Sequence, residues 1–216
     1  MRLRVLWMFL GALLVVATFT FPVWQPIVEN RPADPVEAFP GLDPQLQDDF
    51  LSLPQEQQRA YLAFDSEDHE KALAMVNAAL TPRTSLSDEE QAMPELNAPI
   101  TVASGTFQQI NPVRGAQGTV NIYQDAANDL TMRLEGFSMV NGPNLRVLLS
   151  PAEAPRVSTD LTVGDVEPVD AGVLLATNSS QNYTLPNLDL AEYHSVVIFS
   201  EALDLIYTYA PLFVRQ

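Results

Sequence analysis

Residues 130–150 read LTMRLEGFSMVNGPNLRVLLS, and this stretch decides the fold of the 216-residue chain. Apolar residues recur at every second position before and after Asn141-Gly142-Pro143, from Leu130 to Leu134 and from Leu145 to Leu149. A period of two places one face of each segment in a core, and the intervening residues favour a turn. The stretch therefore predicts two β-strands joined by a tight turn, in which we expect Gly142 to supply a positive φ.

The same alternation extends through the C-terminal half of the chain. It recurs at Val120 and Ile122, at Val196 and Ile198, and from Leu205 to Tyr209. Short strands separated by turn-forming residues are typical of an antiparallel sandwich or barrel rather than a parallel sheet. We predict a mainly β protein with a C-terminal antiparallel β-sandwich over residues 99–216.

A different period precedes the β-domain. Between residues 43 and 82 apolar residues fall three or four apart, which predicts two or three short amphipathic helices, with Leu73, Val76 and Leu80 on one buried face. Residues 83–98 are acidic and polar, and are expected to form a linker with one helical turn capped by Ser87 and Glu90.

The N-terminal segment has the length and composition of a membrane span. Residues 5–24 carry no charge and are long enough to cross a bilayer core, whereas Arg2 and Arg4 precede them. The positive-inside rule then keeps residues 1–4 in the cytoplasm and places the bulk of the chain outside. We predict a single-pass signal anchor, followed by a proline-rich stalk over residues 25–42; a cleaved signal peptide is the alternative.

Composition excludes several classes of function. The chain has 27 acidic and 11 basic residues and a net charge of −16, which argues against nucleic-acid binding. It contains no cysteine, so disulfides, thiolate metal sites and cysteine nucleophiles are excluded. Two histidines are too few for most histidine-based metal sites, and the acidic loop with Asp165, Glu167 and Asp170 lacks the spacing of a calcium loop. We predict no metal site.

An ordered series of short motifs carries a resemblance to a known family. It consists of Gly105-Thr106-Phe107; Gly118 with Val120 and Ile122; Leu134 to Phe137; Asn141-Gly142-Pro143 with Leu145 and Leu149; Gln181-Asn182-Tyr183 with Pro186; and Tyr193 to Ile198. Over roughly residues 100–213 the chain resembles the DM thirteen domain family, the "electron transfer DM thirteen" domain. The resemblance implies an extracytoplasmic β-sandwich, which in bacteria is often carried on a membrane anchor.

The resemblance also implies a site. The family's proposed redox chemistry rests on a cysteine after the VVI-type strand, and Ser200 stands at that position here. A hydroxyl supplies neither a thiolate ligand nor a disulfide state. By resemblance, the candidate binding residues are Ser200, Asn141, Gly142, Pro143 and Tyr183, and no catalytic residue is predicted.

Two functions follow. We expect a non-catalytic, membrane-anchored module that binds a protein or glycan partner outside the membrane, with no cofactor. The alternative is an electron-transfer accessory protein that binds haem or copper through residues such as Met132, Met139 and His194. A hydrolase that uses Ser200 as nucleophile and His194 as base has little support, because no G-x-S-x-G motif surrounds the serine.

Overall fold

The structure is a computed structural model that describes residues 38–82 and 84–214. The predicted cytoplasmic end (1–4), membrane anchor (5–24) and most of the stalk (25–42) lie outside the described residues. Within residues 38–82 and 84–214, no helix is long and apolar enough to cross a membrane.

Four short helical elements form the first described part of the chain. They are η1 (Pro44–Leu46), α3 (Gln47–Ser52), α4 (Gln55–Asp65) and α5 (His69–Leu80). The Asp68 carboxylate accepts the Lys71 N–H at 3.1 Å and so caps α5, because the first N–H groups of a helix have no partner within it. Ala72, Met75 and Val76 form the buried face of α5, at the three-to-four spacing that amphipathic helices show. Of the predicted stripe, only Val76 is fully buried.

The end of the predicted stalk packs into this helical segment. Phe39 and Leu42 are buried, and the Phe39 ring meets the Phe50 ring edge-on with centroids 5.3 Å apart. The Gln47 side chain fixes the same turn, because its Nε2 donates to the Phe39 carbonyl at 2.8 Å and its Oε1 accepts the Phe39 N–H at 3.0 Å. Residues 38–42 therefore contribute apolar surface to the core of the helices.

The acidic linker carries the capped turn that its sequence predicts. Helix α6 (Asp88–Gln91) begins after Ser87, and Ser87 and Glu90 form a reciprocal capping box. The linker also contacts the β-domain, because Leu86 N–H donates to the Ser179 hydroxyl at 2.8 Å and the Asn182 amide donates to the Ala92 carbonyl at 2.8 Å.

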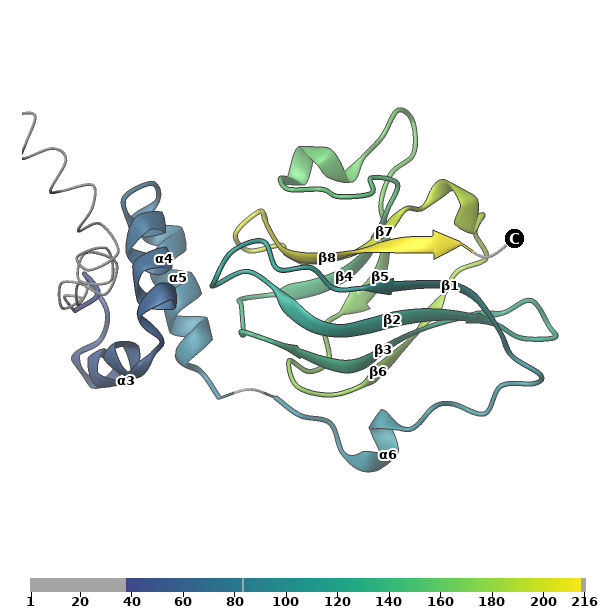
Figure 1. The fold of residues 1–216 in the computed structure, drawn as a ribbon, viewed down its shortest axis with the longest axis horizontal. Coiled ribbons are helices and arrows are strands. Elements are labelled where there is room, and N and C mark those ends of the chain that lie inside the picture. The colour runs from purple at the N-terminus through teal and green to yellow at the C-terminus, as the bar shows by residue number, and fades with distance from the viewer. Residues whose placement is uncertain (1–37, 83, 215–216) are drawn as a thin grey trace, which may run out of the picture. The chain divides into compact units, whose positions relative to one another are not determined.

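The β-domain is one antiparallel sheet of eight strands (Figure 1). Along the sheet the strands follow the order β5-β4-β7-β8-β1-β2-β3-β6. Their bounds are β1 (Ile100–Thr106), β2 (Ala116–Gln124), β3 (Leu130–Met139), β4 (Leu145–Ser150), β5 (Val169–Val173), β6 (Gln181–Leu185), β7 (Ser195–Ser200) and β8 (Leu205–Val214). The predicted mainly β, antiparallel architecture is confirmed.

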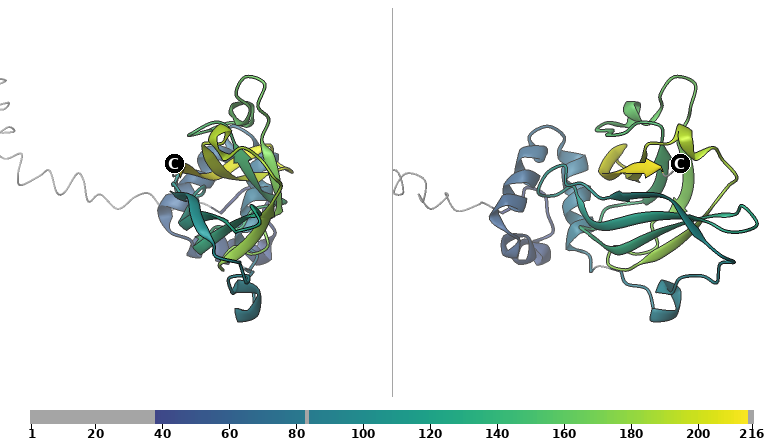
Figure 2. Two further views of the ribbon diagram at one scale, coloured as in Figure 1. Left: turned by 90° about the vertical axis from the view of Figure 1, so that its right-hand side faces the viewer. Right: turned by 45° about the vertical axis from the view of Figure 1, so that its right-hand side comes forward.

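The sheet nearly closes on itself, because its two edge strands, β5 and β6, approach each other (Figure 2). Strand β8 pairs with β7 through most of its length and with β1 through Leu212 to Val214, so it belongs to both halves of the sheet. The domain is therefore a single curved sheet rather than the two separate sheets that a sandwich implies. Gly105 on β1 allows β8 to approach this closely, because a Cβ there would lie 2.4 Å from the Pro211 carbonyl oxygen.

Candidate functional site

Ser200 ends strand β7 and is fully buried, with no exposed surface. Its hydroxyl donates a hydrogen bond of 2.6 Å to the Pro143 carbonyl. Its neighbours across the ladder are Leu145 on β4 and Leu205 on β8. The side chain thus points from the end of β7 to the turn between β3 and β4, and holds that turn against the sheet.

A second pair of contacts holds the same turn. Glu201 N–H donates to the Asn144 carbonyl at 3.1 Å, and the Asn144 amide donates to the Glu201 carboxylate at 3.0 Å. Asn144 is also the residue of this turn that has a positive φ, at 45°. Asparagine tolerates this conformation better than most residues, since its short polar side chain forms local hydrogen bonds.

The prediction that Gly142 supplies the positive φ of the turn was wrong, because Asn144 takes that conformation. Gly142 is required for a different reason. A Cβ at this position would lie 2.6 Å from Cζ and 2.8 Å from Oη of Tyr207. The turn therefore lies directly against the edge of a buried tyrosine ring, and only glycine leaves room for it.

Tyr207 was predicted only as an alternating strand residue, and the structure makes it part of the site. Its side chain is 1% exposed and its hydroxyl has no hydrogen-bond partner among the described residues. Burial raises the pKa of Tyr207 well above its ordinary value, and the neighbouring Tyr61 of α4 contributes to the rise. An alternating pattern marks a buried strand residue, but no sequence signal separates this tyrosine from an ordinary core residue.

The structure therefore brings together four of the five predicted site residues. Ser200 and Pro143 are hydrogen-bonded, and Asn141 and Gly142 belong to the same turn, where the Asn141 side chain accepts the Gly142 N–H at 3.0 Å. Tyr183 lies apart from them.

Tyr183 lies on β6, where the two edges of the sheet approach each other. Its hydroxyl donates to Gln181 Oε1 at 2.8 Å, lies 3.3 Å from the Val173 carbonyl of β5 and accepts the Leu175 N–H at 3.3 Å. Burial raises the pKa of Tyr183 well above its ordinary value. These contacts hold β6 close to the end of β5, so we assign Tyr183 a structural role.

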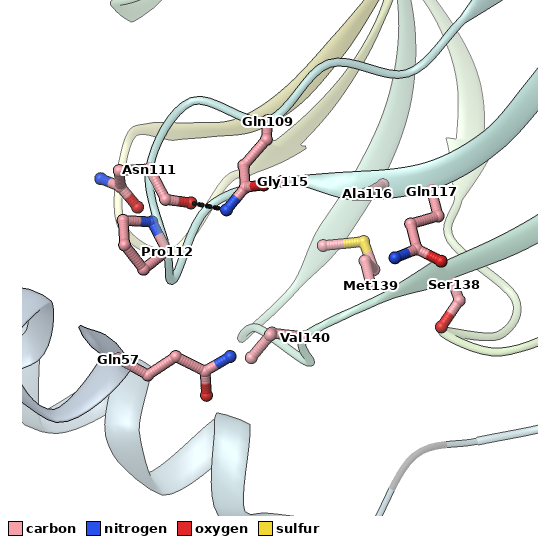
Figure 3. A pocket seen from close by; sticks show the side chains of 10 residues that line it. All are labelled: Gln57, Gln109, Asn111, Pro112, Gly115, Ala116, Gln117, Ser138, Met139 and Val140. Atoms are coloured by element: carbon pink, nitrogen blue, oxygen red, sulfur yellow. Dashed lines mark hydrogen bonds between the residues drawn. The ribbon is translucent and has the colours of Figure 1, made fainter. Parts of the chain in front are cut away.

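A polar cleft opens beside the turn (Figure 3). It has a volume of about 270 Å³ and lies between α4, the loop that joins β1 to β2, and the adjoining ends of β2 and β3. Its lining residues are Gln57, Gln109, Asn111, Pro112, Gly115, Ala116, Gln117, Ser138, Met139 and Val140. Val140 directly precedes the Asn141 turn, so the cleft and the Ser200 contact share one end of the domain.

Comparison with known families identifies the β-domain. Residues 106–212 match the family model described as Electron transfer DM13. These residues form a DM13 domain. Searches of curated proteins and of solved structures gave no match. The DM13 match begins at the last residue of β1, although β1 itself starts at Ile100.

The DM13 domain of this chain has no thiol at the Ser200 position or anywhere else, since the sequence has no cysteine. At that position stands a buried hydroxyl whose hydrogen is used in the bond to Pro143. The arrangement fixes a turn, and it offers no group that cycles between redox states.

The other candidate ligands are not gathered in this DM13 domain. Met132 is fully buried on β3 opposite Ile122 and Tyr183, and Met139 lines the polar cleft. His194 is exposed just before β7, at the opposite end of that strand from Ser200. Six residues of extended chain span about 20 Å, at roughly 3.3 Å per residue. His194 therefore cannot act as a base for Ser200, and the serine-hydrolase hypothesis is overturned.

Carboxylates do not form a metal site in the part of the chain that the structure describes. No group of three or more histidine, aspartate or glutamate side chains there is placed to hold a metal ion. In the acidic loop, Asp170 pairs with Arg146, whose Nε lies 2.8 Å from the carboxylate, and Glu167 accepts the Thr162 hydroxyl at 2.8 Å. These carboxylates have structural partners.

Proposed function

We propose that this protein is a membrane-anchored, extracytoplasmic DM13 protein that acts as a non-catalytic binding module. The observation that carries the proposal is the buried Ser200 hydroxyl, which donates to Pro143 where the family's redox hypothesis needs a thiol. By bonding the turn to β7, Ser200 fixes the position of a loop at this end of the domain. Binding sites are commonly formed by loops that a rigid scaffold holds in place.

The polar cleft supports the binding part of the proposal. It lies beside the turn that Ser200 holds, and α4 of the helical segment contributes Gln57 to its wall. Polar groups fixed in a concave site can orient a ligand without any chemistry. The helical segment and the DM13 domain would then act together, on a protein or glycan partner outside the membrane.

The location rests on the N-terminal sequence. The uncharged segment 5–24 follows Arg2 and Arg4, an arrangement that favours an uncleaved anchor with the DM13 domain outside. Alkaline extraction of membranes from the native host tests this part, because an integral protein stays in the membrane pellet. Externally added protease should then degrade the DM13 domain in intact cells or spheroplasts. Release into the soluble fraction at alkaline pH would contradict the anchor.

The family description favours a second candidate function, an electron-transfer accessory protein whose cofactor is not ligated by cysteine. A visible absorption spectrum and a metal analysis of the full-length chain from its native host separate the two functions. We expect a colourless preparation without stoichiometric iron or copper. A haem or flavin spectrum, or one copper per chain, would replace the binding proposal with the redox one.

A further inference from the structure

The side chains that line the polar cleft are rich in amides and contain no charge. Gln57, Gln109, Asn111 and Gln117 each present a carboxamide, and none of the ten lining residues is acidic or basic. This is unusual local chemistry in a chain whose net charge is −16. A carboxamide carries two N–H donors and an acceptor oxygen, so it pairs equally well with the donor and the acceptor of a hydroxyl group.

Two of these amides are held in place by the loop itself. Asn111 Oδ1 accepts the N–H groups of Val113 and Arg114 at 3.0 and 2.8 Å, which leaves its Nδ2 as a donor. Gln109 Nε2 donates to the Asn111 carbonyl at 3.2 Å, which leaves its Oε1 as an acceptor (Figure 3). A fixed donor and a fixed acceptor therefore come from the same loop, and their orientation is set before any ligand arrives.

Gly115 maintains this arrangement. A Cβ at Gly115 would lie 2.8 Å from Cγ and 3.0 Å from Cα of Gln109. The absence of a side chain at this position lets Gln109 lie against the backbone of the returning loop. Across the cleft, the Gln57 side chain on α4 forms no hydrogen bond within residues 38–82 and 84–214, so its amide is available to a ligand.

We propose that this cleft binds a neutral saccharide, so that the binding module of the proposed function, on which this inference rests, recognises a glycan. Uncharged amides can donate hydrogen bonds to sugar hydroxyls and accept hydrogen bonds from them, and they carry no charge that would favour binding of an ion. Pro112 and Val140, which are partly exposed, add apolar surface for the C–H face of a ring, whereas Met139 is buried. The cleft volume of about 270 Å³ lies near the lower end of ligand pockets, roughly 300 Å³, which suits one or two sugar rings.

The test uses saturation-transfer NMR on the full-length chain in a detergent without a sugar headgroup. The probes are three neutral disaccharides: cellobiose, maltose and N,N′-diacetylchitobiose. Gln57→Ala and Gln117→Ala each remove one amide from the cleft wall. Gln55→Ala on the same helix and Gln124→Ala on the same strand are matched controls, since neither residue lines the cleft.

We expect a transfer signal from at least one disaccharide. Losing one amide should weaken its binding about two- to twelvefold, because a neutral hydrogen bond contributes about 0.5–1.5 kcal/mol. The control variants should bind like the parent chain. The proposal is overturned if none of the three probes gives a signal, or if the signal persists unchanged in both Gln57→Ala and Gln117→Ala. Tighter binding of an acidic saccharide than of these probes also overturns it, because the cleft has no cation to favour one.

The outcome is separable from that of the proposed function. A chain that is membrane-bound and colourless but ignores the three disaccharides keeps the proposed function and loses the saccharide inference. A chain with a haem, flavin or copper centre loses the proposed function, whatever the disaccharides do.

Discussion

The Ser200 hydroxyl donates a 2.6 Å hydrogen bond to the Pro143 carbonyl, and so joins the end of β7 to the turn between β3 and β4. The two residues are 57 positions apart in the chain, and the donor is fully buried. By the resemblance seen in the sequence, Ser200 stands at the position where the DM13 family's redox hypothesis expects a cysteine. In this chain that position therefore supports the turn of a candidate binding surface.

Ser200→Ala should destabilise the protein by about 0.5–1.5 kcal/mol, because it removes a hydrogen bond between the fully buried Ser200 hydroxyl and the partly buried Pro143 carbonyl. Chemical denaturation followed by far-UV circular dichroism measures the change. Ser195→Ala is the comparison variant. It removes a similar hydrogen bond, from Ser195 to the Ala152 carbonyl, at the other end of the same strand and away from the Asn141 turn. Equal stability of Ser200→Ala and the parent chain would remove the structural role argued for Ser200.

Ser200→Cys restores the thiol that the family hypothesis invokes, but in a buried site. We expect this thiol to react with Ellman's reagent only slowly in the native protein and fully after denaturation, because reactivity requires exposure and thiolate character. Fast native reaction, at the rate of a free cysteine, would show that the turn opens readily and that the position is accessible to chemistry.

Gly142→Ala should cost about 1–3 kcal/mol, the usual range for overpacking a well-filled site, because the new Cβ meets the Tyr207 ring. Tyr207→Leu should relieve part of that cost. A double-mutant cycle on unfolding free energies should therefore give a favourable coupling between the two changes. Additive effects would mean that the turn does not lie against the ring.

Tyr207→Phe should leave stability unchanged or raise it slightly, because it removes a buried hydroxyl that has no hydrogen-bond partner among the described residues. The thermal midpoint of the variant measures this. Tyr183→Phe is the contrasting change, since the Tyr183 hydroxyl is bonded to Gln181 and its loss should lower the midpoint. A large loss in Tyr207→Phe would reveal a partner for that hydroxyl.

The buried tyrosines predict how stability depends on alkaline pH. Burial raises the folded-state pKa of Tyr61, Tyr183 and Tyr207 above the unfolded value of about 10. The unfolded chain therefore loses these protons first, so their contribution to stability is complete below pH 10 or so and is lost as the pH rises above it. Absorbance at 295 nm should show these three ionising only with unfolding; their smooth ionisation in folded protein would contradict their burial.

Local sequence patterns predicted the β-strands, the short helices and the capped turn at Ser87. Each of these elements depends on residues that are near one another in the chain. The composition alone excluded thiol chemistry, because the chain contains no cysteine. Phe39 escaped prediction as a core residue, since a proline-rich segment has no helical or strand period. It is buried because its ring packs against Phe50 of α3, which in turn lies beside Tyr61 of α4.

Only the tertiary structure decided what the predicted site residues do. Ser200 meets Pro143, and Gly142 meets Tyr207, through the register of β4, β7 and β8, which joins residues dozens of positions apart. The separation of His194 from Ser200 has a local cause, because the two lie at opposite ends of the extended strand β7 although they are close in sequence. Local patterns specify which residues form strands, but the pairing of distant strands determines which side chains share a site, and that pairing depends on how the whole core packs.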